Sequence, residues 1–153
     1  MRYGDVIDAE KDNDSFYIVD VPGFGYAKVP DKLKKEWSLF LAEYVAKRET
    51  LRVIFHLIDA RHGPTDEDKS IMKQMNDILP KTVKYVIILT KADKNVKGPS
   101  TKNSGKVSEN VMNLVQEAMR DNNISKTPVV LTSAETKLGR DDVWKYMRLA
   151  AEA

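Results

Sequence analysis

Four short segments carry acidic, basic and hydroxyl side chains suited to binding a ligand, and each follows an apolar run of the chain. They are Asp20-Val21-Pro22-Gly23, Asp59-Ala60-Arg61-His62, Thr90-Lys91-Ala92-Asp93 and Thr132-Ser133-Ala134-Glu135. Carboxylates suit hard divalent cations, and they can also accept hydrogen bonds from neighbouring N–H donors. What these side chains can bind therefore depends on whether the fold brings the four segments together.

The four apolar runs are short, rich in Val, Ile and aromatic residues, and do not alternate with polar residues. They extend from Phe16 to Val21, from Val53 to Ile58, from Tyr85 to Leu89 and from Val129 to Leu131. Runs of this kind are typical of parallel strands buried on both faces. Open parallel sheets bind ligands beyond the carboxyl ends of their strands. We therefore expect the four polar segments to share one edge of a sheet.

Apolar residues recur every three or four positions between these runs, which predicts helices. The expected helices span Lys32 to Lys47, Glu67 to Leu79, about Val107 to Asp121 and about Asp141 to Ala151. Because strands and helices alternate, the chain should form one α/β domain with three layers, α/β/α, and a mostly parallel sheet. A weaker extended stretch, Tyr3 to Ala9, could pair with the first apolar run.

Other side chains are expected to serve the structure. Thr65 and Asp68 have the spacing of a capping box at the start of the second helix. His56 lies inside an apolar strand and should be a core histidine with satisfied hydrogen bonds. Three aromatic residues at helical spacing are expected in the core: Trp37, Tyr44 and Trp144. The inward faces of the helices should also include Leu33, Leu114, Val143 and Met147.

The composition is that of an ordinary soluble protein, with 42% hydrophobic residues, 31% charged residues and a net charge of +2 over 153 residues. The chain has no cysteine, which excludes disulfides and favours a reducing compartment. The N-terminus lacks the apolar core of a signal peptide, and no apolar run approaches the ~20 residues that span a bilayer. We therefore expect a cytoplasmic protein, or an organelle-matrix protein in a eukaryote, with no membrane contact.

Three of the four polar segments match the later motifs of GTP-binding domains, in the same order and each at the end of a strand. The match narrows when their neighbours are included. The strings are DVPGFGYA from Asp20, DARHGP from Asp59 and TKAD from Thr90, with a Trp-containing helix between the first two. Together they resemble the EngB-type (YihA/YsxC-like) GTP-binding proteins of the P-loop GTPase superfamily. The resemblance covers nearly the whole chain and implies that GTP/GDP and Mg²⁺ are its ligands.

The first motif would bind the metal ion and the γ-phosphate. The resemblance implies that Asp20 holds Mg²⁺ through a water molecule, in keeping with the preference of hard cations for oxygen ligands. Pro22 and Gly23 would belong to the nucleotide site, because a glycine has no Cβ to obstruct the approach of its N–H to phosphate. The switch loop that follows would include Phe24, Gly25 and Tyr26. Phe24 stands where Ras-like GTPases place a water-orienting glutamine, so no catalytic residue is assigned and turnover should be slow.

The later motifs would recognise the base. Asp93 would accept hydrogen bonds from the N1–H and N2–H₂ groups of guanine, which adenine cannot supply, and an unpaired carboxylate would reject the wrong base. The stem of Lys91 would lie along the purine, and Thr90 stands where many GTPases carry asparagine. The backbone N–H of Ala134, which follows Ser133, would contact guanine O6.

The phosphate-binding loop of such a domain is missing from the sequence. A G-x-x-x-x-G-K-[ST] string should follow the first strand and open the first helix, and none is present. The nearest string, Gly98 to Lys106, has the wrong spacing. Without this loop most of the phosphate-binding energy is lost. We interpret residues 1–153 as the C-terminal two-thirds of one EngB-type GTPase domain, lacking its first strand, P-loop and first helix, and incompetent or weak as a fragment.

Three functional interpretations follow. The first is a GTPase switch with guanine nucleotide and a ribosomal precursor or rRNA as partners, because the family is associated with assembly of the large ribosomal subunit. The second is a degenerate module that docks on a ribosome or its precursor without hydrolysing nucleotide. The third, a phospho-acceptor receiver domain, is disfavoured because Ala92 rather than proline follows Lys91. Arg61 and His62 are expected to shape their loop rather than to act in catalysis.

Overall fold

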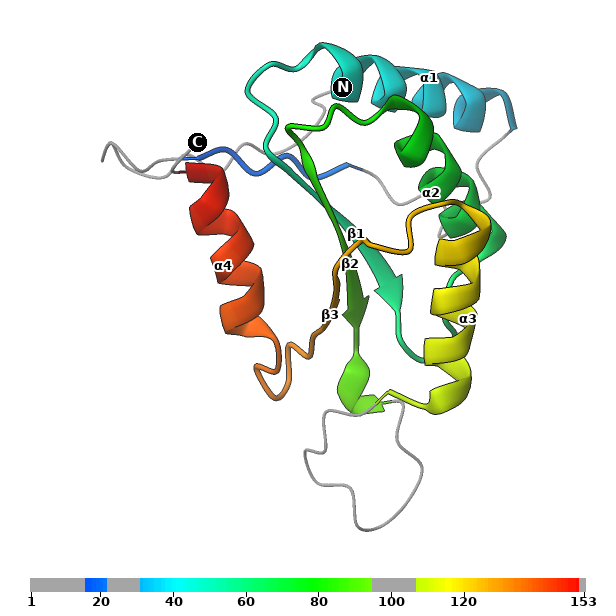
Figure 1. Ribbon diagram of the computed structural model, residues 1–153, viewed down its shortest axis with the longest axis vertical. Helices are drawn as coiled ribbons and strands as arrows, with labels where there is room; N and C mark the ends of the chain where they lie inside the picture. The colour runs from blue at the N-terminus through cyan, green and yellow to red at the C-terminus, as the bar shows by residue number, and fades with distance from the viewer. Residues whose placement is uncertain (1–15, 22–30, 95–106, 152–153) are drawn as a thin grey trace.

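The computed structural model describes residues 16–21, 31–94 and 107–151 of the chain. Figure 1 shows a small sheet with helices on both sides. The elements are α1 (Asp31–Lys47), β1 (Val53–Asp59), α2 (Asp66–Ile78), β2 (Lys84–Thr90), the 3-10 helix η1 (Ala92–Lys94), α3 (Glu109–Asp121), β3 (Val129–Leu131) and α4 (Arg140–Ala151). Three of the predicted strands and all four predicted helices are confirmed to within two residues at each end.

The sheet is parallel and has the order β1-β2-β3. Asp59 at the end of β1 is in register with Thr90 at the end of β2, and Leu89 is in register with Leu131 at the end of β3. The carboxyl ends of the three strands therefore reach the same edge of the sheet. We call this edge the rim; it consists of residues 59–62, 90–93 and 132–135.

Helices cover both faces of the sheet, which confirms the three-layer α/β/α architecture. The larger core lies between the sheet and helices α1, α2 and α3, and its fully buried side chains include Val45, Ile58, Met72, Ile87 and Val115. The smaller core lies under α4 and is formed by Val86, Ile88 and Val130, with Val143 and Tyr146 packed against them. Figure 1 shows α2 and α3 on one side of the strands and α4 on the other.

The predicted first strand is not formed. Residues 16–21 have no strand structure, and the side chains of Tyr17, Ile18, Val19 and Val21 are exposed. An extended segment becomes a strand only by pairing with a neighbour, and within the described residues the sheet holds only β1, β2 and β3. The weaker stretch predicted from Tyr3 to Ala9 lies outside the described residues.

Strand β1 forms one edge of this sheet and pairs, among the described strands, with β2 alone. Leu57, in the middle of β1, has 62% of its surface exposed. A long apolar edge strand with an exposed leucine is unusual, because such an edge readily pairs with further chain.

Some helix residues predicted to face inward do not. Leu33 and Trp144 are exposed and so is Leu114, whereas Trp37 and Tyr44 are half-buried. Helix α4 has no fully buried residue, although Val143 and Met147 are half-buried. The reason is the small size of the sheet face beneath α4, because the described sheet has three strands and β3 has only three residues.

Two local predictions are confirmed. Thr65 and Asp68 form a capping box in which Thr65 Oγ1 accepts from the backbone N–H of Asp68 and the Asp68 carboxylate accepts from the backbone N–H of Thr65. His56 is buried in the core, with Nδ1 2.6 Å from the Tyr85 hydroxyl and Nε2 3.0 Å from Asp68 Oδ1. The cap of α2 is thereby tied to the middle of the sheet.

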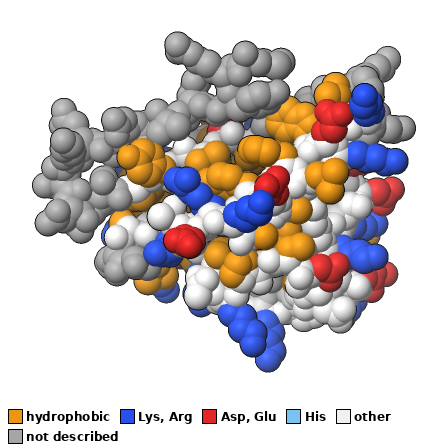
Figure 2. Space-filling model, turned by 90° about the horizontal axis from the view of Figure 1, so that it is seen from above, with side chains coloured by type: hydrophobic (Ala, Val, Ile, Leu, Met, Phe, Trp, Pro, Cys, Tyr) orange, Lys and Arg blue, Asp and Glu red, His pale blue; other side chains and the backbone are white. Residues whose placement is uncertain are grey.

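The outer face of α1 is partly apolar, because Leu39 and Phe40 are exposed. Figure 2, seen from above Figure 1 on the side where α1 lies, shows hydrophobic side chains gathered near the centre of this face with charged side chains among them. Within the described ranges, no helix is both long and apolar enough to cross a bilayer.

Candidate functional site

Backbone hydrogen bonds join the three strand ends at the rim. The N–H of Ala60 donates to the carbonyl of Thr90 at 2.8 Å, and the N–H of Ala92 donates to the carbonyl of Thr132 at 3.0 Å. These bonds continue the parallel ladder beyond the strands themselves. The segments predicted to read a base, Thr90–Asp93 and Ser133–Ala134, are therefore held side by side.

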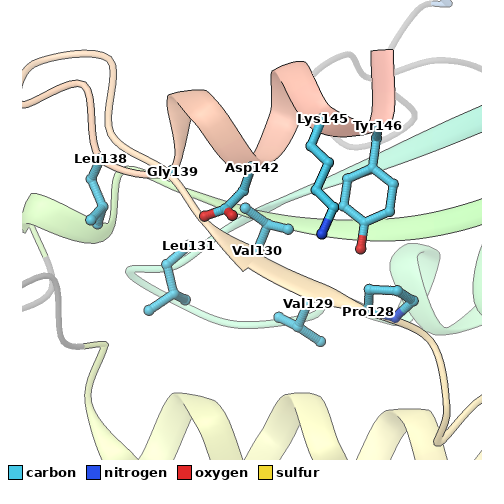
Figure 3. Close-up of a pocket in the computed structure, with 9 residues that line it drawn as sticks. All are labelled: Pro128, Val129, Val130, Leu131, Leu138, Gly139, Asp142, Lys145 and Tyr146. Carbon is cyan, nitrogen blue, oxygen red and sulfur yellow. The ribbon is translucent and has the colours of Figure 1, made fainter. Parts of the chain in front are cut away.

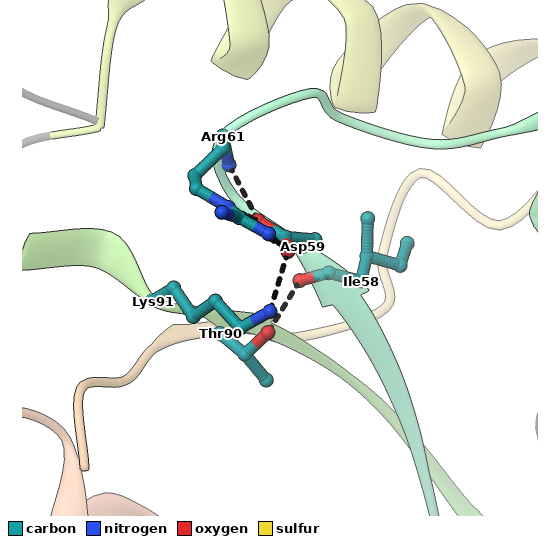
Figure 4. Close-up of polar contacts among 5 residues, drawn as sticks. All are labelled: Ile58, Asp59, Arg61, Thr90 and Lys91. Carbon is teal, nitrogen blue, oxygen red and sulfur yellow. Dashed lines mark hydrogen bonds and ion pairs between the residues drawn. The ribbon is translucent and has the colours of Figure 1, made fainter. Parts of the chain in front are cut away.

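An ion cluster occupies the end of β1 (Figure 4). Arg61 donates to both oxygens of Asp59, from Nε at 2.9 and 3.1 Å and from Nη2 at 2.7 Å, and its backbone N–H donates to Oδ1 at 3.0 Å. Lys91 Nζ lies 2.9 Å from Asp59 Oδ2. The hydrogen bond from the Arg61 side chain, with a further contribution from Lys91, holds the pKa of Asp59 well below its usual range despite the opposing effect of burial.

The backbone of Lys91 has a left-handed conformation, with φ at 56°. This region is unfavourable for a residue with a Cβ, so neighbouring contacts must hold it. The N–H of Lys94 donates to the Lys91 carbonyl at 3.0 Å, which closes the single turn of η1. Immediately before it, the Thr90 hydroxyl donates to the carbonyl of Ile58 at 3.3 Å. The start of the TKAD segment is thus fixed to the end of β1.

The carboxylate of Asp93 is available for a ligand as far as the described residues show. Asp93 lies in η1 and is half-buried, and the described part of the chain gives its carboxylate no hydrogen bond or ion pair. It therefore remains the group best suited to accept hydrogen bonds from a base at this edge.

The loop after β3 presents the backbone of Ala134. Ser133 is buried, its N–H donates to the carbonyl of Leu138, and its Oγ accepts from the N–H of Thr136. Ala134 is exposed, and its N–H makes no hydrogen bond among the described residues. The loop turns back at Gly139, where φ is 69° and an added Cβ would lie 2.0 Å from the carbonyl oxygen of Leu131. Only glycine allows this close return.

Among the described residues, the segment that contains Asp20 pairs with no strand of the sheet. In Figure 1 residues 16–21, drawn in blue, cross the upper part of the view below α1, whereas the arrows of β1 and β2 point downwards. The side chain of Asp20 is exposed. Pro22, Gly23 and the predicted switch residues Phe24, Gly25 and Tyr26 lie outside the described residues. Of the predicted site, the structure thus brings together the two segments that the sequence predicts to read the base.

A hollow of about 410 Å³ lies elsewhere, between β3 and α4 (Figure 3). It is lined by apolar residues of β3 and by Asp142, Lys145 and Tyr146 of α4. None of its lining residues belongs to the rim or to the predicted nucleotide-binding residues. Shape alone therefore does not mark the site; the polar groups at the strand ends do.

Sequence reasoning assigned no role to Asp59 or Gly139. An acid and a base two positions apart, at the end of a strand next to one that ends in Thr-Lys, were the available signal for the Asp59 cluster. Gly139 gave no signal of its own, because its close approach to Leu131 depends on the path of the loop. His62, which was expected to shape its loop, is exposed.

No group of three or more His, Cys, Asp or Glu side chains that could hold a metal ion occurs within the described residues. A magnesium ion bound with a nucleotide does not need such a group, because it commonly takes one or two carboxylates and completes its shell with phosphate and water oxygens. A single carboxylate such as that of Asp20 is compatible with this chemistry.

The parallel sheet, the helices on both faces and the order of the strand-end motifs are those of the P-loop GTPase class of α/β folds. The model of the 50S ribosome-binding GTPase family matches residues 3–91, more than half of the chain. The chain belongs to this family, and its relatives place it among the EngB-type GTP-binding proteins.

Three relatives illustrate the similarity, and each is named a probable GTP-binding protein EngB. The protein of Lactiplantibacillus plantarum is 33% identical over 90% of this chain and 63% of its own length. That of a Geobacillus species is 35% identical over 86% and 62%, and that of Symbiobacterium thermophilum is 33% identical over 95% and 57%. The chain thus spans less than two-thirds of the length of these relatives.

Proposed function

We propose that this chain is the guanine-reading part of a GTP-dependent switch domain. The observation that carries the proposal is the meeting of the TKAD and SAE segments at one rim, joined by the hydrogen bond from Ala92 to Thr132. This arrangement places on one rim the half-buried carboxylate of Asp93, the ion-paired side chain of Lys91 and the N–H of Ala134, which makes no hydrogen bond among the described residues. The family to which the chain belongs supports guanine nucleotide as the ligand.

Each group has a chemical task in this proposal. Asp93 accepts from N1–H and N2–H₂ of guanine, and the N–H of Ala134 donates to O6. Adenine carries neither donor pair nor a carbonyl at these positions, so it leaves both protein groups unsatisfied. The methylene stem of Lys91 covers one face of the purine, while Thr90 and Ser133 hold the two loops through their own hydrogen bonds.

We further propose that Asp20 binds Mg²⁺ through water and that Pro22 and Gly23 approach the γ-phosphate, with Phe24, Gly25 and Tyr26 as the switch. This role requires residues 16–21 to pair as a strand, because only then would Asp20 reach the rim. Magnesium supplies charge neutralisation of the phosphates when it is bound, and this chain offers it a carboxylate.

The phosphate-binding loop is proposed to come from sequence outside these 153 residues. Two observations support this: the chain covers 62–63% of two of its relatives, and the edge strand β1 exposes 62% of Leu57. A further strand between β1 and residues 16–21 would cover this edge and draw Asp20 towards the rim. Residues 1–153 then form the C-terminal two-thirds of the domain, with weak affinity when alone.

The partner in this proposal is a ribosomal precursor or rRNA, met in the cytoplasm. The description of the matching family as ribosome-binding supports it. The exposed side chains of Lys32 and Lys35 on α1 are suited to contact RNA phosphates. The domain would act in assembly of the large subunit, with its switch loop ordered by GTP.

The base-reading role is tested by substituting Asp93→Asn. An amide presents a donor in place of one acceptor, so the variant should bind guanine nucleotides more weakly and xanthine nucleotides more tightly. We expect wild-type chain to prefer GDP over XDP by roughly tenfold or more, the worth of a charge-assisted hydrogen bond, and the variant to reverse this order in NMR titrations.

The matched control is Asp121→Asn, the same change at an exposed residue at the end of α3. It should leave the preference for GDP intact. If Asp93→Asn titrates with GDP and XDP as the wild-type chain does, Asp93 does not read the base and the proposed function is wrong.

A further inference from the structure

The Lys91 side chain is held in place before any ligand binds, and the residue that holds it belongs to a different strand. Its ammonium lies 2.9 Å from Asp59 Oδ2, across the register pair that joins the ends of β1 and β2. Figure 4 shows the stem of Lys91 extended along the rim towards Asp59. A long flexible side chain is thereby fixed at both its backbone and its head.

The Asp59 carboxylate is itself fixed without Lys91. Arg61 binds both of its oxygens, and the backbone N–H of Arg61 adds a further bond. A guanidinium that engages both oxygens restricts the orientation of a carboxylate more than a lysine can. The position of the Lys91 ammonium therefore depends on Asp59, and the orientation of Asp59 depends on Arg61.

The backbone conformation of Lys91 also indicates that its side chain is held in place. Its φ of 56° lies in the left-handed region, where non-glycine residues are uncommon and often functional. This conformation turns the side chain out of the direction it would take in a continuing strand. In its new direction the side chain forms the ion pair with Asp59. An ordinary surface lysine needs no such backbone.

We propose that Asp59 is a positioning residue for base recognition: its carboxylate, oriented by Arg61, holds the Lys91 ammonium so that the lysine stem is presented to the face of a bound guanine. The inference rests on the proposed function, because it names how that same site is ordered. It assigns a task to the Asp59–Arg61 pair, which is not among the residues proposed to contact the base.

The chain offers a matched comparison in the Glu43–Lys47 pair of α1. These side chains are 2.6 Å apart, but they are 63% and 74% exposed, whereas Asp59 and Lys91 are 26% and 43% exposed. Exposed pairs of the first kind order their side chains little. Comparing the two pairs therefore tests whether Asp59 orders the Lys91 side chain or only places an opposite charge near it.

Two readouts test the proposal in the 153-residue chain. The first is the acetylation rate of each lysine, measured by mass spectrometry without nucleotide. Asp59→Asn should raise the rate at Lys91 by roughly twofold to fivefold, the effect of losing a partly buried ion pair. Glu43→Gln should leave Lys91 unchanged. Equal rates at Lys91 in wild type and Asp59→Asn would overturn the proposal whatever the nucleotide results are.

The second readout is NMR titration with GDP and with ADP. Asp59→Asn should weaken GDP binding by roughly threefold to tenfold and leave the response to ADP unchanged, and Asp59→Glu should restore part of the loss. If wild-type chain fails to prefer GDP, the proposed function itself falls. If wild type prefers GDP and Asp59→Asn binds GDP equally well, the function stands and the positioning role of Asp59 is wrong.

Discussion

Two carboxylates in this protein are held by basic side chains from neighbouring positions in the fold, and both keep their charge because of it. Asp59 is bound by Arg61 and Lys91. Asp68 is half-buried, which raises its pKa, but hydrogen bonds from His56 and Thr65 outweigh this and lower the pKa below its ordinary value. An ionised Asp68 only accepts hydrogen bonds, so His56 Nε2 is the donor to Asp68, while His56 Nδ1 lies 2.6 Å from the Tyr85 hydroxyl.

The sign of the resulting pH dependence can be worked out. A carboxyl whose pKa is lowered by folding stabilises the native state above its unfolded pKa, about 3.9 for aspartate, and that stabilisation is lost as the pH falls towards the folded pKa. We therefore expect Asp59 and Asp68 to contribute a constant amount between pH 7 and pH 5. The free energy of unfolding should then decrease below about pH 4, as measured by urea unfolding followed by circular dichroism.

Asp59→Asn isolates the contribution of one of these groups. The variant should be less stable than wild type at pH 7, and the difference should shrink as the solution is acidified below about pH 4. Glu43→Gln, at the exposed pair in α1, should follow the wild-type curve closely. A constant difference between wild type and Asp59→Asn from pH 7 to pH 2 would show that the Asp59 cluster does not stabilise the fold through its charge.

At the scale of elements, glycines in the left-handed region set the loops that surround the rim. Gly63 follows the Arg61 segment with φ at 79°, and Gly139 precedes α4 with φ at 69°. The two differ in their surroundings. A Cβ at Gly63 would meet only the side chains of Val111 and Leu114 at 3.6 Å, whereas one at Gly139 would overlap the carbonyl oxygen of Leu131.

This contrast predicts unequal effects of the same substitution. Gly63→Ala should cost about 1–2 kcal/mol, the penalty for a Cβ in this backbone region. Gly139→Ala should cost at least ~3 kcal/mol, because the backbone must also move away from Leu131. Thermal and urea unfolding measure both. Comparable losses in the two variants would mean that the loop after β3 closes without the tight approach at Gly139.

The elements that could be predicted from the sequence are those determined by residues close together in the chain. β1, β2 and β3 and the α2 cap were identified because the pattern within each segment determines them. The strand predicted for residues 16–21 failed, since a strand also needs a partner that no local pattern supplies. Likewise, the base-reading residues could be named from the TKAD string, but the Asp59–Lys91 pair could not, because it depends on the register between two strands. Trp144 was misplaced because the sheet face beneath α4 is too small to bury it.

At the scale of the whole molecule, the outer edge of β1 and residues 16–21 both lack a strand partner among the described residues. Both are apolar, and one further strand between them could pair with both. In our proposal that strand carries the phosphate-binding loop, so that one addition completes the sheet, brings Asp20 to the rim and provides most of the affinity for nucleotide. In the same proposal, the two segments that read the base already meet at the rim without this strand.

The most direct test of this account is an NMR titration of the 153-residue chain with GDP and, separately, with ADP. We predict that the amide signals of Lys91, Asp93 and Ala134 shift with GDP at millimolar concentrations, roughly the affinity left to a base without its phosphate site, and do not shift with ADP. Equal shifts with both nucleotides, or no shift at these residues with GDP, would contradict the claim that this rim recognises guanine.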